Sequence, residues 1–531
     1  MKVERAVLEK YPDYLNDESG LVNGKADAIY FPENEEEVCQ ILKDASKRKT
    51  PVTVSGGGTG ISGGRVPLEG WILATDLMRQ IPLDGAETWV DEEFNERFSL
   101  KLIEYGDEAI LIVPVAMRLK SIQNFVRERG WFYPPDPTER SSFIGGNVST
   151  NASGARTFKF GSTRDWVAGL RVVLPDGRKL ALSRKKYTSR LPQNFLEGSE
   201  TSLVLSGNYL IWEDKRIPLP TYKLPKVTKN VAGVVWTEKS EPLDLFIGAN
   251  GIFGVVTAIA LRLIRPPQEI LSIFAFCPSW DVALKLVQKA QVQRASGRFP
   301  VPLSVELLDE KAVDIMRGSD GSIPPSKVAI ILEQDASSET IEEAILFWVD
   351  YFDEIGISSS SVAQTHKEIE HHKFLRHLIP ETVNRMVRSN GQPKLGTDYS
   401  VPSERFQELL DRAQQMGKEF ETFQKQNSAS TSFGYIIWAH AGDSHLHLNF
   451  LPRTPEEVAF AKKLMVRLMK EVVAFGGSIA AEHGLGKKKF EGKPALFFQY
   501  GEEGIRQIQE MKQIVDPDFL LNRGNLVPPP M

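Results

Sequence analysis

The glycine-rich segment 55–64 restricts the possible folds of this chain more than any other feature. It reads SGGGTGISGG and follows a short strand-like run, PVTVS. Gly58, Gly60 and Gly63 match the spacing G-x-G-x-x-G, but a Rossmann unit needs a helix that begins inside the loop. Here another strand-like run, WILATDL, follows almost at once and leaves no room for a crossover helix. A P-loop is excluded because no Gly-Lys-Ser/Thr follows. The segment either cradles a phosphate with its backbone N–H groups or forms a flexible surface loop.

Length, charge and cysteine content limit the class of protein. The 531 residues suffice for two or three domains. A net charge of -5 argues against a nucleic-acid partner, because phosphate contacts need a basic surface. Cys39 and Cys277 cannot build a disulfide framework, which favours a reducing compartment. Neither a secretory signal nor a run of ~18 apolar residues is visible. We therefore expect a cytoplasmic protein that meets the inner membrane, if at all, at its surface.

The first half alternates strand-like and helix-like segments. Strands are predicted at 28–32, 51–55, 71–77, 170–174 and 252–264, and an amphipathic helix at 34–49. Residues 144–154, rich in Gly and Asn, are predicted to form a second loop. Residues 184–245 have no clear pattern and are interpreted as an excursion from the first domain. Arg265-Pro266-Pro267 interrupts the strand pattern and marks the predicted domain boundary. The expected domains are therefore 20–267 and 268–531.

The second half predicts strands at 269–277, 327–334, 434–441 and 445–451 between amphipathic helices. Thr454-Pro455-Glu456-Glu457 predicts a capping box at the start of a helix that continues through Leu468 and ends at Gly476-Gly477. This order of elements indicates a sheet with helices packed on it.

The segment YIIWAHAGDSHLHLNF, 435–450, predicts a hairpin with Gly442-Asp443-Ser444 at its turn. On the returning strand His445, His447 and Asn449 share one face, because successive side chains alternate between faces. His440 ends the outgoing strand and can meet His447.

A carboxylate for the same site is expected from Glu482, in the glycine-containing turn AEHGLGK. Two imidazoles, of His440 and His447, and this carboxylate suit a divalent ion such as Zn²⁺ or Mn²⁺. The alternative is a set of satisfied polar residues in a packed site. Four of the 8 histidines (440, 445, 447 and 483) fall in these two short motifs, which favours the metal site.

Four segments of the first half resemble the flavin-binding segments of the vanillyl-alcohol oxidase superfamily: SGGGTGISGG, PPDP at 134–137, GGNVSTNASG at 145–154 and GANGIFGVVT at 248–257. The resemblance implies that the first loop wraps the FAD pyrophosphate, and that the second runs beside the flavin and adenine. Ala249-Asn250-Gly251 departs from the usual Ser-Glu-Gly, and the first loop lacks a histidine for a covalent link, so non-covalent FAD is implied. The implied FAD contacts are Ser55, Gly56, Gly57, Gly58, Thr59, Gly60, Ser62, Gly63, Asp136, Gly145, Gly146, Asn147, Thr150, Gly154, Val256 and Asn525.

HAGDSHLH is similar to the signature H-x-G-D-G-N-x-H of the FAD-linked oxidase C-terminal domain, found in D-lactate, glycolate and D-2-hydroxyglutarate dehydrogenases. The resemblance implies that His440, His447 and Glu482 bind a metal ion and that His483 is the catalytic base. It further implies that Asn449 contacts the substrate. In this chain Ser444-His445 replaces the usual Gly-Asn.

Arg376 resembles the arginine that binds the substrate carboxylate in this family, and a surface salt bridge is the alternative. The hydroxyglutarate enzymes carry a Thr where this chain has Pro380, and a Lys where it has Gly396. These departures favour a smaller acid, D-lactate or glycolate.

The resemblance implies an α+β fold. A PCMH-type FAD-binding domain of two α/β subdomains precedes a FAD-linked oxidase C-terminal domain, whose antiparallel sheet is covered by helices. The implied reaction oxidises a D-2-hydroxy acid: metal coordination lowers the hydroxyl pKa, His483 takes the proton, and hydride passes to the flavin N5. An acceptor protein or a quinone would then reoxidise the flavin. The alternatives are a transferase like alkyl-dihydroxyacetonephosphate synthase and a non-catalytic flavoprotein subunit.

Overall fold

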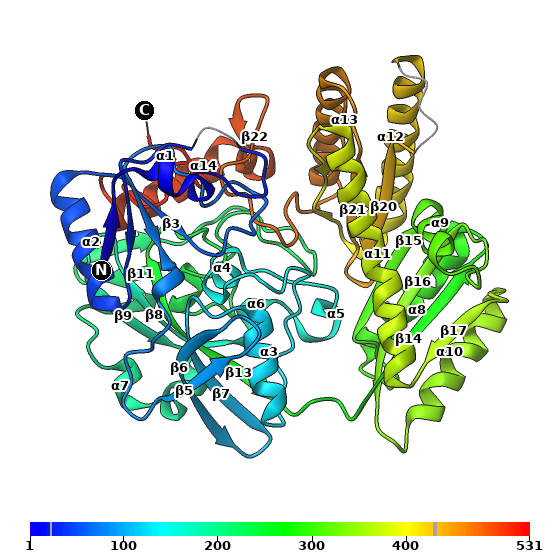
Figure 1. Cartoon of the computed structure of the whole chain (residues 1–531), viewed down its shortest axis with the longest axis horizontal. Coiled ribbons are helices and arrows are strands. Elements are labelled where there is room, and N and C mark those ends of the chain that lie inside the picture. The colour runs from blue at the N-terminus through cyan, green and yellow to red at the C-terminus, as the bar shows by residue number, and fades with distance from the viewer. Residues whose placement is uncertain (22–23, 428–432, 531) are drawn as a thin grey trace.

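The computed structural model describes residues 1–21, 24–427 and 433–530. The N-terminal half forms one lobe and the chain from about residue 268 forms most of a second lobe beside it (Figure 1). The division of the domains at 267/268 stays a prediction, because the last residues of the chain return to the first lobe. There Val52 donates its backbone N–H to Leu520, and the Asn522 side chain accepts from the backbone of Val54.

The first subdomain is a four-stranded sheet in the order β1-β2-β4-β3. Its strands are β1 (Lys2–Glu4), β2 (Ala28–Phe31), β3 (Val52–Ser55) and β4 (Trp71–Ala74). Both β2 and β3 pair with β4 in parallel. The predicted helix is α2 (Glu35–Arg48), which Asn34 caps by accepting from the backbone of Glu37. Residues 56–70, which the structure describes throughout, hold no helix between β3 and β4, so the exclusion of a Rossmann unit is confirmed.

The second subdomain is a six-stranded antiparallel sheet, β5-β6-β7-β13-β8-β9. Its strands are β5 (Glu87–Asp91), β6 (Glu96–Tyr105), β7 (Glu108–Pro114), β8 (Val167–Val173), β9 (Lys179–Ser183) and β13 (Val255–Ile264). The strand expected at 252–264 thus begins at Val255, and it lies at the centre of the sheet between β7 and β8. Helix α3 (Leu119–Glu128) buries Ile122 and Phe125 in the core of this lobe.

The C-terminal lobe contains an antiparallel sheet in the order β17-β14-β16-β15-β20-β21-β18, and β19 also pairs with β21. Its strands are β14 (Glu269–Cys277), β15 (Ser304–Asp309), β16 (Val328–Ala336), β17 (Ser360–Ala363), β18 (Leu395–Gly396), β19 (Tyr399–Ser400), β20 (Tyr435–His440) and β21 (His445–Phe450). Alternation along β15 sends Leu307 to one face and Leu308 to the other.

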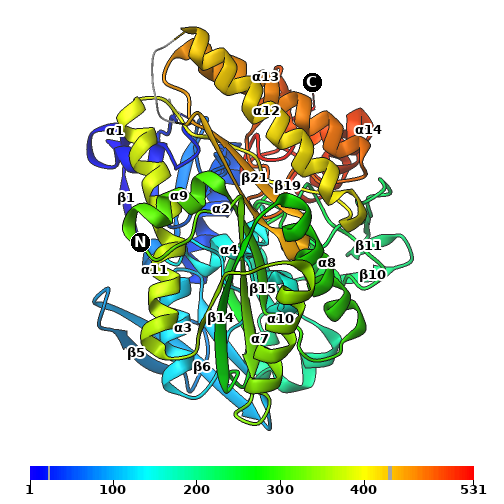
Figure 2. The same cartoon turned by 90° about the vertical axis from the view of Figure 1, so that its right-hand side faces the viewer.

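Helices cover both faces of this sheet (Figure 2). Leu307 belongs to the large core shared with α8 (Trp280–Ser296), α10 (Ile341–Ile355), α12 (Phe406–Asn427) and α13 (Pro455–Ala474). Leu308 belongs to a separate cluster with α9 (Glu310–Ser319) and α11 (His366–Asn390). A covered antiparallel sheet is the architecture that the resemblance implied.

Two local predictions were wrong. Residues Ile144–Thr150 of the expected second loop form a short helix, α4, which Asn151 ends in a left-handed conformation. Burial of Ile144 and Val148 outweighs the low helix propensity of the glycines. At the start of α13, Thr454 caps the helix, but the Glu457 carboxylate accepts from the backbone of Arg453 instead of completing the capping box.

The excursion 184–245 carries a small three-stranded sheet, β10 (Leu203–Ser206), β11 (Tyr209–Trp212) and β12 (Lys215–Pro218). This sheet contacts α14 (Ala495–Val515), which belongs to the C-terminal part of the chain. After β12 the chain runs into the interior, where the Lys229 side chain is buried.

Candidate functional site

A cavity lies between the first glycine loop, helix α4 and the turn that carries Glu482 and His483. The predicted cofactor residues that line it are Gly56, Gly57, Gly58, Thr59, Gly60, Ser62, Gly145, Gly146, Asn147, Thr150, Val256 and Asn525. Four of the predicted contacts, Ser55, Gly63, Asp136 and Gly154, are not part of the cavity lining. The lining also includes polar residues that were not among the predicted contacts: Thr138, Ser142, Ser149, Ser153 and Asn250. Glu482, a predicted metal ligand, and His483, the predicted base, line the same cavity, so both lie at the space expected to hold the cofactor.

Close contacts explain why glycine stands at Gly145, in the cavity wall, and at Gly154, just outside it. A Cβ at Gly145 would lie 2.9 Å from the Cβ of Val115, and a Cβ at Gly154 would overlap the carbonyl oxygen of Asp136. At Gly56 and Gly146, in contrast, no atom of the described residues lies within 4 Å of the position of a Cβ, apart from the adjacent residues and, at Gly146, the backbone of its own helix. These two glycines leave open space at the wall, which fits close approach of a cofactor to the backbone.

The histidine hairpin is confirmed. Strands β20 and β21 pair antiparallel, with His440 opposite His445 and Trp438 opposite His447. Ser444 closes the turn in a left-handed conformation, with φ 52°. Directly opposed residues project from the same face of a sheet, so His440, His445 and His447 point to one side.

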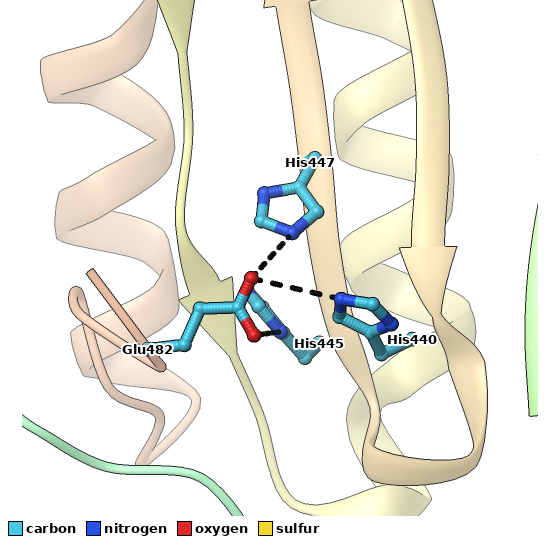
Figure 3. A group of neighbouring side chains, drawn as sticks. All are labelled: His440, His445, His447 and Glu482. Carbon is cyan, nitrogen blue, oxygen red and sulfur yellow. Dashed lines mark ion pairs between the residues drawn. The ribbon is translucent and has the colours of Figure 1, made fainter. Parts of the chain in front are cut away.

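That side faces Glu482, which the separate turn brings to the histidines (Figure 3). The Nε2 atoms of His440 and His447 lie 3.6 and 3.4 Å from its Oε1, and Nδ1 of His445 lies 3.9 Å from its Oε2. All four side chains are buried. The predicted ligands His440, His447 and Glu482 are thus brought together, and the His483 ring joins them with its Nε2 3.4 Å from Oε1 of Glu482.

The neighbouring groups orient the imidazoles. His447 presents Nδ1 to the carbonyl of Thr397 at 2.9 Å, and His445 presents Nε2 to Oδ1 of Asp398 at 2.9 Å. A carbonyl and a carboxylate are acceptors, so each of these ring nitrogens donates. In the neutral rings the other nitrogen then directs a lone pair at Glu482. Ring-nitrogen lone pairs that point at the Glu482 carboxylate would repel it unless a cation lay between the nitrogens and the oxygens. Imidazole and carboxylate groups are suitable ligands for such a divalent ion.

Charges in the site shift several pKa values. Burial alone would raise the pKa of Glu482, but the Lys229 ammonium and the neighbouring histidines hold it well below its usual range. Burial lowers the pKa of His483 and, helped by the proximity of His447, lowers that of His445 to about 3. For His447, burial is outweighed by the Glu482 carboxylate, so its pKa is raised. Glu482 is therefore a carboxylate, and the His483 imidazole is neutral at neutral pH.

Comparisons with known proteins agree with this arrangement. Residues 266–526 match the family model "FAD linked oxidases, C-terminal domain", and residues 26–183 match the model "FAD binding domain". The chain belongs to this family of FAD-linked oxidases.

Among its relatives are glycolate oxidase subunit GlcD of Bacillus subtilis (25% identical over 97% of this chain and 91% of the relative) and a D-2-hydroxyglutarate dehydrogenase of Xanthomonas citri (27%, over 94% and 89%). A D-lactate dehydrogenase of Archaeoglobus fulgidus is 25% identical over 94% of this chain and 91% of the relative.

Two solved structures share the fold of this chain. A 4-ethylphenol oxidase from Gulosibacter chungangensis superposes with a TM-score of 0.64 and 16% identity, covering 99% of this chain and 94% of that one. An alkyldihydroxyacetonephosphate synthase gives 0.63 and 14%, covering 98% and 82%. At these identities the likeness extends to the fold alone. In the described part of the chain, no helix is long and apolar enough to cross a membrane.

The two predicted substrate residues have protein partners. Arg376 donates from Nη2 to Glu306 at 2.8 Å, and its Nε lies 2.7 Å from the other carboxylate oxygen. The Arg376 side chain is 27% exposed, so this ion pair is partly buried, and the role of Arg376 toward the substrate carboxylate stays a prediction. Glu306 also lies 3.7 Å from Nδ1 of His440, which places Arg376 next to the histidine cluster. Asn449 is buried on the same strand face as His447, and its Nδ2 donates to the His447 carbonyl.

Lys229 and Asp398 were not among the predicted site residues. Lys229, from the excursion, donates to Oε2 of Glu482 at 3.0 Å and to the carbonyl of Gly154 at 2.7 Å. Asp398 accepts from the backbone of His483 at 2.9 Å and from that of Glu482 at 3.3 Å. Lys229 lies in no recognisable motif, whereas Asp398 follows two residues after Gly396, a position that the family resemblance singled out.

Proposed function

We propose that this chain is an FAD-dependent dehydrogenase that oxidises a D-2-hydroxy acid to the 2-oxo acid. The observation that carries the proposal is the shared position of Glu482 and His483. Both line the cavity formed by the glycine loop and α4, and Glu482 also meets the three histidines of the hairpin. The dehydrogenase and oxidase relatives support the same class of reaction.

The protein's part in the reaction is to bind, orient and deprotonate. His440, His447 and Glu482 would hold a divalent ion, which when bound supplies Lewis acidity toward the substrate hydroxyl. His483 accepts the hydroxyl proton on its imidazole, since burial keeps the ring neutral. FAD, when bound, supplies the acceptor for the hydride that leaves Cα as the C=O bond forms. Asn449 and Arg376 would orient the carboxylate of the acid.

We further propose a small substrate, D-lactate or glycolate, in preference to a dicarboxylate. Arg376 already shares its charge with Glu306, and Pro380 stands in α11 where hydroxyglutarate enzymes carry a Thr. A Lys at 396 would have to displace Asn449, because a Cβ at Gly396 lies 2.9 Å from Oδ1 of Asn449. A second substrate carboxylate therefore lacks an evident partner among these residues. The electron acceptor, a protein or a quinone, and a cytoplasmic or membrane-surface location remain parts of this proposal.

The test is anaerobic mixing of the FAD-loaded enzyme with single acids, followed by the visible absorbance of the flavin. D-Lactate or glycolate should bleach the flavin rapidly, L-lactate and D-2-hydroxyglutarate slowly, and a chelator should abolish the rapid phase. Rapid bleaching by D-2-hydroxyglutarate would overturn the proposed size limit alone. A flavin that no 2-hydroxy acid reduces would contradict the dehydrogenase and favour a non-catalytic subunit or a transferase.

A further inference from the structure

His445 occupies the position at which the family signature has Asn, and its imidazole faces the proposed metal centre. Its side chain is fully buried, and Nδ1 lies 3.9 Å from Oε2 of Glu482. Among the described residues, no hydrogen-bond partner reaches this Nδ1. Buried ring nitrogens are normally paired, so the unpaired atom calls for a ligand.

We propose that His445 is a fourth protein ligand, so that three imidazoles and one carboxylate hold the metal ion. The inference deepens the proposed function and rests on it for the presence of the ion. One potential ligand atom from each of His440, His445, His447 and Glu482 lies within 4.8 Å of the others. Two ligands of one ion are at most about 4.2 Å apart, at roughly 2.1 Å per bond. Inward shifts of about half an ångström therefore complete the set.

The tautomer of His445 favours this role. Its Nε2 donates to Asp398, whose carboxylate also accepts from the backbone of Glu482 and of His483. Asp398 can only accept here, so the proton of the neutral His445 ring is on Nε2 and the lone pair of Nδ1 points at Glu482. A carboxylate that holds the far nitrogen of an imidazole is the usual outer partner of a metal-binding histidine.

Lys229 does not fill the same role. Its ammonium reaches Oε2 of Glu482 and the carbonyl of Gly154, and it offsets part of the carboxylate charge. The Nδ1 atom of His445 still has no partner among the described residues. The added nitrogen also changes the preferred metal, because imidazoles suit Zn²⁺ and Co²⁺ better than Mn²⁺. We therefore infer a zinc-type centre that retains fewer positions for substrate than a three-ligand site.

The test compares Zn²⁺ affinity in FAD-loaded wild type, His445→Asn and a control, His372→Asn. His372 is a buried histidine of the same lobe that lies between Ser272 and Ser361. After metal removal, Zn²⁺ is titrated against a chromophoric chelator, and Co²⁺-loaded samples give ligand-field spectra at wavelengths beyond the flavin bands. His445→Asn should bind Zn²⁺ at least tenfold more weakly and change the Co²⁺ spectrum, whereas His372→Asn should do neither.

Equal Zn²⁺ affinity and equal Co²⁺ spectra in wild type and His445→Asn would overturn the fourth ligand, as would a wild type that binds no metal. If His445→Asn fails to fold, X-ray absorption of the Zn²⁺-loaded wild type decides, since three imidazoles support the proposal and two refute it. Both readouts are independent of turnover. If the zinc centre has four protein ligands but no 2-hydroxy acid reduces the bound flavin, the proposed function is wrong and the fourth-ligand inference is still supported.

Discussion

Replacing Asp398 by Asn should loosen the turn that carries Glu482 and His483. The Asp398 carboxylate lies beneath this turn and accepts three kinds of donor: the His445 ring and the backbone N–H groups of Glu482 and His483. Burial would raise its pKa, but His483 and His445 hold that pKa well below its usual range, so the group is ionised. Asparagine keeps the shape and replaces one acceptor oxygen by an NH2 donor.

The size of the effect follows from the lost acceptor. Whichever way the substituted side-chain amide turns, it faces at least one N–H donor with an N–H of its own. An unpaired buried donor costs about 1–3 kcal/mol, and a hydrogen bond to a charged group contributes roughly 1.5–3 kcal/mol. We expect a net loss of about 2–4 kcal/mol, which corresponds to a roughly 30- to 1000-fold larger population of the locally open turn.

Hydrogen exchange of the amides in 481–486, read by mass spectrometry on the FAD-loaded enzyme, measures this opening. The control is Asp335→Asn, which breaks a partly exposed pair with Lys159 and should cost less than about 1 kcal/mol. Exchange in 481–486 should accelerate in Asp398→Asn alone. Wild-type protection of this segment in Asp398→Asn would refute the role given to the carboxylate.

Three further predictions concern the base and the cofactor. His483→Gln should slow flavin reduction by about 10²–10⁴-fold with unchanged FAD content, and a smaller loss argues against a general base. Burial lowers the pKa of His483 below 6.5, and the base acts as the neutral imidazole. We therefore expect kcat/KM to be constant around pH 7 and to fall only as the pH drops through that lowered pKa. An inflection above pH 7 would contradict this assignment. Gly154→Ala should destabilise the fold by overlap with Asp136, whereas Gly146→Ala, with open space around it, should fold normally and bind FAD more weakly. Equal thermal stability of the two variants would contradict this difference.

The sequence predicted those parts of the fold whose pattern is local. Alternation along 445–450 and the turn residues before it were sufficient for the hairpin, because both signals lie within one supersecondary unit. Helix α4 was missed since its glycines argue against a helix, and burial of Ile144 and Val148 overrides that preference. The backbone bond from Val52 to Leu520 joins distant parts of the chain, and no local pattern predicts such a pairing.

At the candidate site, the motifs predicted which residues come together better than they predicted which other groups those residues contact. His440, His447 and Glu482 were expected to meet and do lie together. The pairing of Arg376 with Glu306 was not expected, because a motif for an anion-binding arginine does not reveal a carboxylate on the neighbouring strand. His445 was noticed as a departure from the family signature, but the direction of its Nδ1 depends on Asp398, which comes from another segment.

Lys229 explains why the irregular segment 184–245 matters to the site. A buried ammonium needs acceptors, and those of Lys229 come from two different lobes: the carbonyl of Gly154 beside the cofactor cavity and the carboxylate of Glu482. Breaking either contact would leave a buried charge poorly compensated, which is costly. The excursion therefore couples the cofactor half to the histidine cluster through one side chain, and displacement of one half relative to the other disturbs the electrostatics of Glu482 directly. In the proposed reaction the same alignment would position the hydroxy acid, held at the histidine cluster, against the cofactor in the cavity.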